Sequence, residues 1–162
     1  MGAVRADFFD ASALVRVFTE EPGSDRVRPY FDGRPTKYTT PFCFYETLSA
    51  LKGKWRHKGL LTATQYLDAA FRLTAWYGAT TRTGIKDLNF SDPITFNRAR
   101  SIVERTSLDL SDAFQILSVK YGYFSPLIRD SATVLVTADR ALAEAARSEG
   151  LKVWSVLDED AP

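Results

Sequence analysis

The sequence has 162 residues, of which 45% are hydrophobic and 25% charged, and this composition excludes an intrinsically disordered chain. With 21 Lys and Arg against 20 Asp and Glu, the net charge of +1 gives no sign of a protein that binds nucleic acid through overall charge. One cysteine and one histidine exclude an intramolecular disulfide and the Cys/His cages of structural zinc. We expect a single domain over residues 1–162.

Short apolar runs alternate with longer helical patterns along the chain, and Gly and Pro separate them without a fixed-period repeat. We expect strands at residues 4–9, 37–40 and 133–137, a further candidate strand at 80–88 and a final apolar run at 152–156. We expect helices that begin near residues 12 and 41, and others near 23–31, 62–77, 93–106, 112–121 and 140–148.

Continuously apolar strands that alternate with helices are typical of a parallel sheet covered on both faces. We therefore predict an α/β fold, a three-layer α/β/α sandwich with a central, mainly parallel sheet. Ligands bind such sheets at the carboxyl ends of the strands. Asp10 and Asp139 each follow an apolar strand, so both should lie at that edge.

Both acids also suit the start of the helix that follows, because Asp is a favoured N-cap. Ser12 is available to cap the first helix, which would leave Asp10 free to point into the crevice. At the last helix, Thr137 and Asp139 could each be the cap. The residues alone leave a capping role and a functional role open for each acid.

A third acid, Asp112, follows Ser111, a good N-cap, in the segment LDLSDAFQIL. Asp112 shares a helical face with Ile116 and Val119 and is therefore expected to point inward. Its alternative role is that of a charge partner for the helix dipole. Asp109 competes with Asp112 for this role, but it precedes the expected cap, and we interpret it as part of the loop.

A fourth acid, Glu46, lies in the helix expected to begin at Pro41, with Thr40 as its cap. Glu46 falls almost opposite the apolar stripe of this helix, on a side that carries small residues. The periodicity therefore leaves open whether it faces solvent or closely approaches another element. Cys43, in the same helix, lies in an apolar run and is expected in the core.

Carboxylates that converge in one crevice repel one another, and a divalent cation relieves that repulsion. Ligand sets made only of oxygen suit Mg²⁺ or Mn²⁺ rather than zinc. The chemistry that such a site performs is phosphodiester hydrolysis with a metal-activated water. We therefore treat the four acids together as a candidate magnesium or manganese site.

Four segments resemble, in order, the motifs of the PIN domain family, and specifically its VapC-type toxin ribonucleases of type II toxin–antitoxin systems: FFDASALVRVFTEEPGSDRV, YTTPFCFYETLSAL, LDLSDAFQIL and VLVTADRALAEAARSEGLKVW. The resemblance extends over nearly the whole chain. It implies a PIN-like fold and an endoribonuclease that cleaves RNA with water activated by Mg²⁺ or Mn²⁺. The residues that it assigns as both catalytic and metal-binding are Asp10, Glu46, Asp112 and Asp139. Ser12 and Thr137 would support the site.

The resemblance also implies a cognate protein antitoxin that blocks the acidic pocket, and a homodimer. The N-terminal sequence has no leader pattern and no segment has the ~20 apolar residues of a membrane span, so we expect a cytoplasmic protein. The connection from Asp112 to Asp139 is longer than we expect of the family, which makes Asp130 a competitor for the last acid. The TADRAL context favours Asp139.

The segment LKGKWRHKG combines basic residues with an aromatic ring, as proteins that bind single-stranded RNA do. Its RNA-binding candidates are Lys52, Lys54, Trp55 and Arg56. The alternative is a solvated helix end in which Trp55 continues the apolar stripe. A second candidate patch consists of Arg98, Arg100 and Arg105.

Two other functions compete with the ribonuclease. The first is a PIN-fold module that binds RNA or a protein without cleaving, which a broken acidic quartet would favour. The second is a haloacid-dehalogenase-like phosphatase with Asp10 as nucleophile. That class needs an acid two residues later, where this sequence has Ser12. Phosphate-binding loops of the GxxxxGK[ST] and GxGxxG types are absent from the sequence.

Overall fold

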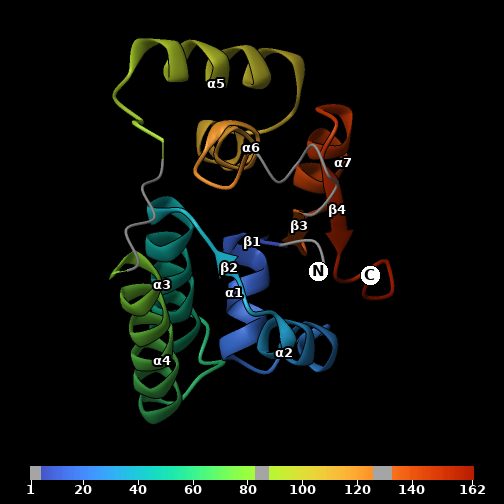
Figure 1. Ribbon diagram of the computed structural model, residues 1–162. Coiled ribbons are helices and arrows are strands. Elements are labelled where there is room, and N and C mark those ends of the chain that lie inside the picture. The colour runs from blue at the N-terminus through green and yellow to red at the C-terminus, as the bar shows by residue number, and fades with distance from the viewer. Residues whose placement is uncertain (1–4, 83–87, 126–132) are drawn as a thin grey trace.

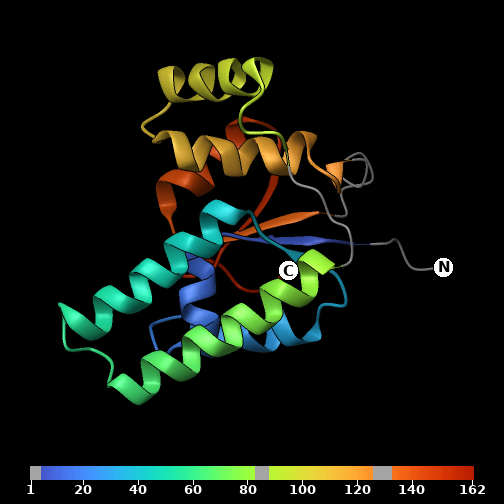
Figure 2. The ribbon, with the colours of Figure 1, turned by 90° about the vertical axis from the view of Figure 1, so that its left-hand side faces the viewer.

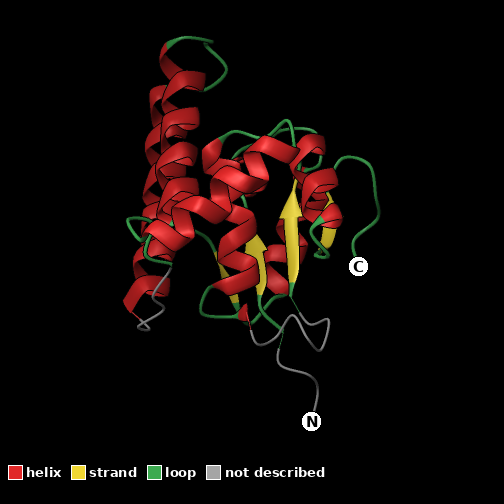
Figure 3. Ribbon diagram, turned by 90° about the horizontal axis from the view of Figure 1, so that it is seen from above, coloured by secondary structure: helices red, strands yellow, loops and turns green. Residues whose placement is uncertain are grey.

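The structure is a computed structural model that describes residues 5–82, 88–125 and 133–162. Its centre is a four-stranded parallel sheet with the strand order β2-β1-β3-β4, and the strands run in the same direction in Figure 3. The strands are β1 (Asp7–Phe9), β2 (Lys37–Tyr38), β3 (Val134–Thr137) and β4 (Lys152–Ser155).

Helices cover both faces of this sheet (Figures 1 and 2). They are α1 (Ala11–Phe18), α2 (Ser24–Gly33), α3 (Pro41–Arg56), α4 (Ala63–Arg82), α5 (Pro93–Arg105), α6 (Leu110–Tyr121) and α7 (Arg140–Ser148). In Figure 1, α1 and α2 lie below the sheet, and α6 lies above it with α5 outermost. The hairpin of α3 and α4 packs beside α1, and α7 packs on β3 and β4. The predicted α/β/α sandwich with a parallel sheet is confirmed.

The two central strands are buried on both faces, which explains why their sequences are continuously apolar rather than alternating. Phe8 and Phe9 of β1 and Leu135 and Val136 of β3 are completely buried. Phe9 also packs edge-to-face on Phe31 of α2, with ring centroids 5.0 Å apart. The central strands are therefore held rigidly between the helical layers.

Helix starts follow local sequence rules, although not always at the expected residue. Thr40 caps α3 by accepting a 3.1 Å hydrogen bond from the Cys43 amide, and Pro41 occupies the first turn, as predicted. The expectation for α6 was wrong, because Asp109 rather than Ser111 is its cap and the helix begins two residues early. In the candidate strand at 80–88, residues 80–82 belong to α4 and residues 83–87 lie outside the described part.

The short turn between α1 and α2 depends on Gly23, which has a φ of 89°. A Cβ atom there would lie 2.9 Å from Cγ1 of Val156, so a larger residue would meet both backbone strain and a clash. Within the described ranges, no helix is both long and apolar enough to span a membrane.

Candidate functional site

Asp10 and Asp139 lie at the carboxyl edge of the sheet because they follow two adjacent parallel strands. Phe9, the last residue of β1, is in register with Val136 of β3. The Asp10 amide continues this pairing with a 3.1 Å hydrogen bond to the Val136 carbonyl. Asp139 follows two residues after the end of β3. The predicted placement of both acids at this edge is confirmed.

Asp10 is buried, with 3% of its surface exposed, and several donors hold its carboxylate. Thr137 Oγ1 donates to Oδ2 at 2.6 Å, the Ala13 amide donates to Oδ1 at 2.7 Å, and Ser12 Oγ lies 2.9 Å from both oxygens. Asp10 is thus itself the N-cap of α1, and the expectation that Ser12 would cap this helix was wrong. Ser12 and Thr137, which the resemblance implies as supports of the site, both contact Asp10.

Burial raises the pKa of Asp10 from its ordinary value of 3.8 to about 6. The hydrogen bonds from Thr137, Ala13 and Ser12 oppose this rise, and the charge of Asp139 adds to it. Asp10 therefore holds its proton to a higher pH than an exposed aspartate does.

The same two hydroxyls connect the loops that carry Asp10 and Asp139. Thr137 Oγ1 accepts a 2.9 Å hydrogen bond from the Asp139 amide, and Ser12 Oγ accepts one of 2.8 Å from the Ala138 amide. Asp139 also caps α7 by accepting from the Leu142 amide at 3.1 Å, while its side chain stays exposed. Capping and placement at the edge are therefore compatible for both strand-end acids.

Asp112 approaches the strand-end acids from the start of α6. Burial, followed by the charges of Asp109, Asp139, Glu46 and Asp10 in that order, raises its pKa from the ordinary value of 3.8 to about 7. The Asp109 carboxylate accepts a 3.0 Å hydrogen bond from the Asp112 amide. Asp109 is thus a fifth acid near this group, although the sequence analysis set it aside as a loop residue. The sequence did carry a signal for its capping role, because an N-cap accepts a hydrogen bond from the amide three residues later and Asp109 lies three residues before Asp112.

Glu46 is exposed to solvent, so the solvent-facing alternative is the one that the structure shows. Its pKa is nevertheless raised, first by partial desolvation and then by the charges of Asp109 and Asp139, which places it within electrostatic reach of the other acids. Cys43, one turn earlier on α3, is completely buried as expected, and its pKa rises to about 12 through burial and the nearby charges of Asp10 and Glu46.

The donor chemistry of this group fits a hard divalent cation. Among the described residues, no ion pair involves Asp10, Glu46, Asp112 or Asp139. Arg140 adjoins Asp139 in the sequence but pairs with Asp158 instead, at 2.6 Å. Negative charges that raise one another's pKa and have no cationic partner attract a metal ion.

In the described part of the chain, the carboxylates are not arranged around a single metal position. Within residues 5–82, 88–125 and 133–162, no three Asp, Glu, His or Cys side chains lie close enough to hold one ion together. Binding would therefore require the more exposed side chains to rotate toward Asp10. The competing acid Asp130 lies outside the described residues.

The RNA-binding candidates lie toward the other end of α3. Lys54 forms an ion pair with Glu21, and Trp55 stacks on Tyr66 of α4 with ring centroids 4.8 Å apart. The Arg56 guanidinium lies over the Trp55 ring, 3.8 Å from its centroid, and Lys52 is exposed. Eight residues of helix separate Glu46 from Lys54, or about 12 Å. The structure does not bring these residues to the acidic group.

The second basic patch is also occupied by contacts within the protein. Arg105 pairs with Glu149 at 2.6 Å, Arg100 pairs with Glu104 at 3.4 Å, and Arg98 lies over the ring of Tyr121. These contacts favour structural roles over RNA binding for this patch.

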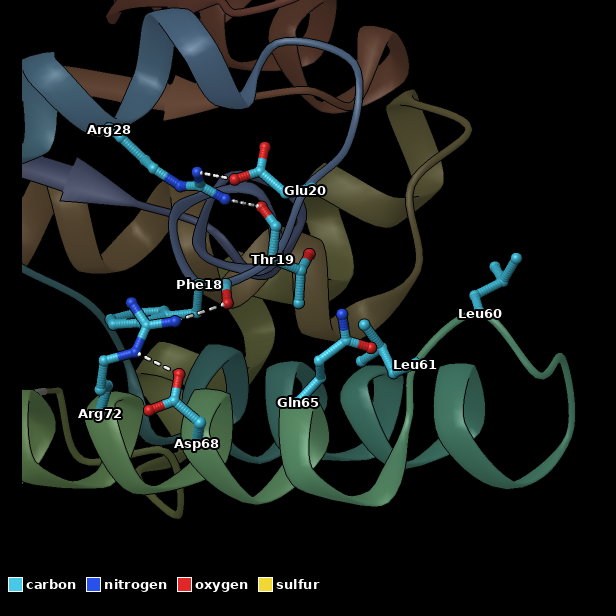
Figure 4. A pocket seen from close by; sticks show the side chains of 9 residues that line it. All are labelled: Phe18, Thr19, Glu20, Arg28, Leu60, Leu61, Gln65, Asp68 and Arg72. Atoms are coloured by element: carbon cyan, nitrogen blue, oxygen red, sulfur yellow. Dashed lines mark hydrogen bonds and ion pairs between the residues drawn. The ribbon is translucent and has the colours of Figure 1, made fainter.

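A pocket of about 320 Å³ lies where the end of α1 meets α2 and α4 (Figure 4). Two arginines in it bind main-chain carbonyls at the end of α1. Arg28 donates to Val17 at 2.9 Å and also to Thr19, and Arg72 donates to Phe18 at 3.1 Å. Because these cations satisfy the last carbonyls of α1, at the negative end of its dipole, we interpret the arginines as a helix cap.

Comparisons with known proteins agree with this architecture. The crystal structure of FitAcB from Neisseria gonorrhoeae matches 94% of this chain and 99% of its own, with a TM-score of 0.59. The sequences are 13% identical, so the likeness concerns the fold alone. No curated protein matches the sequence. The model of the family described as PIN domain matches residues 8–148, a range that includes all four predicted acids. The chain therefore belongs to the PIN domain family.

Proposed function

We propose that the protein is a metal-dependent endoribonuclease and the toxin of a type II toxin–antitoxin pair. PIN domains are generally nucleases and typically use divalent metals. The observation that carries the proposal is the group of Asp10, Glu46, Asp112 and Asp139, whose charges act on one another at one edge of the sheet. RNA as the substrate follows from the resemblance to VapC-type toxins.

The four acids would hold Mg²⁺ or Mn²⁺, and the bound ion supplies an activated water and stabilises the leaving oxygen of the phosphodiester. The protein fixes the orientation of the Asp10 side chain. β1 delivers Asp10 from a buried strand, and donors from Ser12, Ala13 and Thr137 fix both of its oxygens. These hydrogen bonds fix Asp10 in advance, so that only the more exposed acids would need to rotate when the ion binds.

The resemblance further supports a cognate antitoxin that covers the acidic edge, a homodimer and a cytoplasmic location. Lys52 and Arg56 are the RNA-binding candidates whose side chains are most open to solvent. We propose them as contacts for an RNA strand that extends away from the cleavage point.

The test is cleavage of a pool of total cellular RNA by purified protein with Mg²⁺, with Mn²⁺ and with EDTA. We expect cleavage in both metals, none in EDTA and none with Asp10→Asn. Asp25→Asn is the matched control, because Asp25 is an exposed acid in the first turn of α2. Intact RNA with folded, metal-loaded wild-type protein would overturn the proposal.

The competing function is a PIN module that binds RNA without cleaving it. The present separation of the carboxylates, with no three at ligating distance among the described residues, favours it. An electrophoretic shift of RNA by the wild-type protein, without fragments in either metal, would establish this function in place of the first.

A further inference from the structure

Gln115 is a polar residue in an otherwise apolar part of α6. It lies one turn after Asp112, and 1% of its surface is exposed. The residues around it in the helix, from Ala113 to Val119, are all buried. A long amide at such a position needs hydrogen-bond partners, because burial removes it from water.

The Gln115 amide is only half satisfied. Its Nε2 atom donates a 3.1 Å hydrogen bond to Oδ1 of Asp112. Its Oε1 atom is buried and has no hydrogen-bond partner in the part of the chain that the structure describes. An unsatisfied buried carbonyl lowers the free energy of unfolding, and an apolar side chain of similar shape would not carry this cost. Core packing alone therefore does not account for a glutamine here.

Among the described residues, the side-chain hydrogen bond of Gln115 goes to a member of the acidic group. Asp10 has donors on both oxygens, from Thr137, Ala13 and Ser12. For the Asp112 carboxylate, by contrast, Gln115 is the one hydrogen-bond donor within the described ranges. The orientation of Asp112 thus depends on this bond, which holds Oδ1 and leaves Oδ2 without a donor.

We propose that Gln115 is a positioning residue of the metal site, which holds Asp112 so that its second oxygen faces the other carboxylates. The inference rests on the proposed function, because it assigns Gln115 to the same ion. Partners that orient a ligand in this way typically change metal affinity by about 10- to 100-fold when they are removed.

The experiment is a Mn²⁺ titration of metal-free full-length protein, followed by electron paramagnetic resonance, without RNA. Gln115→Met removes the amide and keeps a flexible side chain of similar length. Leu117→Met is the matched control, because Leu117 is also buried in α6 and carries no polar group. Thermal unfolding of each metal-free protein is measured in parallel.

We expect Gln115→Met to raise the Kd for Mn²⁺ about tenfold or more. Its Tm without metal should equal or exceed that of the wild type, because the unsatisfied carbonyl is gone. Leu117→Met should leave the Kd unchanged. A purely structural role predicts the reverse, a lower Tm with an unchanged Kd. If the Met variant does not fold, Gln115→Leu provides the same comparison.

Each outcome separates this inference from the proposed function. If the wild type binds Mn²⁺ and Gln115→Met binds it equally well, the positioning role is overturned and the metal site stands. If Leu117→Met weakens binding as much as Gln115→Met, the effect is one of packing and the role is again overturned. If the folded wild type binds no Mn²⁺, the metal site itself fails, and the positioning role fails with it.

Discussion

Thr137 donates a 2.6 Å hydrogen bond to the Asp10 carboxylate, although 127 residues separate the two in the sequence. The bond joins the end of β3 to the start of α1 inside the core. It also opposes the rise in the pKa of Asp10 that burial causes. One hydroxyl therefore serves both the stability of the sheet edge and the ionisation of the central acid.

Thr137→Val should lower the free energy of unfolding by about 2 kcal/mol at neutral pH, because it removes a donor from a buried carboxylate. It should also raise the pKa of Asp10, so that Mn²⁺ binding begins at higher pH than in the wild type. Urea unfolding and Mn²⁺ binding across pH measure the two effects. Thr47→Val is the control, since the buried Thr47 hydroxyl bonds to the Cys43 carbonyl and, among the described residues, to none of the acids. An equal pH shift in this variant would refute the explanation.

The metal-free protein should lose stability as pH rises from about 4 to about 7. The pKa values of Asp10 and Asp112 are raised to about 6 and about 7, so the folded state binds more protons than the unfolded state in this window. For Asp10 the shift corresponds to about 3 kcal/mol at most. The lowered pKa of Glu149 acts in the opposite direction, but below its ordinary value of 4.5.

Thermal unfolding across this pH range, with EDTA and with Mn²⁺, measures the effect. The ion should remove most of the loss, because it stabilises the ionised acids. Asp10→Asn should flatten the curve in EDTA. A wild-type Tm that rises steadily through the window would contradict the assignment of the two acids.

Glu149 should stabilise the packing of three helices through two ion pairs. It accepts from Arg105 of α5 at 2.6 Å and from Lys120 of α6 at 2.9 Å, at the end of α7. Glu149→Gln should lower the free energy of unfolding by about 1 kcal/mol at neutral pH and leave Mn²⁺ binding unchanged. Glu104→Gln, which breaks an exposed pair with Arg100, should have almost no effect on stability. Equal losses in the two variants would argue against a special role for Glu149.

Arg28→Met should destabilise the protein by about 1–2 kcal/mol, because carbonyls at the end of α1 lose their donors while the side-chain volume is kept. Arg28 bonds to Val17 and Thr19. Arg100→Met is the control, as Arg100 makes only an exposed pair on α5. Chemical unfolding measures both variants, and a neutral Arg28→Met would show that water replaces the arginine at little cost.

The fold and the placement of the strand-end acids could be predicted because a local pattern in the sequence, the continuously apolar strand, implies how distant segments are arranged. Continuously apolar strands such as Val134–Thr137 imply two covered faces, and parallel strands bring Asp10 and Asp139 to one edge. The error at α6 arose because Asp109 and Ser111 are both good caps. Which one begins the helix depends on how α6 packs against α5 and the sheet.

The position of Glu46 and the role of Gln115 could not be read from periodicity. α3 packs against α1 on one side and α4 on another, so an exposed acid opposite its apolar stripe can still lie within electrostatic reach of the other acids. Gln115 interrupts an apolar run, which is a visible signal, but its partner Asp112 lies on a face that the sequence defines only approximately. Capping and placement at the sheet edge were treated as alternatives, whereas Asp10 caps α1 and also lies at that edge.

The parallel pairing of β1 with β3 also sets the time at which the acidic group can form. A ribosome synthesises Thr137 127 residues after Asp10, and domains fold as units. Until β3 has left the ribosome, Asp10 has neither its neighbouring strand nor the hydroxyl of Thr137. Under the proposed function, a nascent chain that stops before β3 would therefore not cleave RNA and would not need to be neutralised.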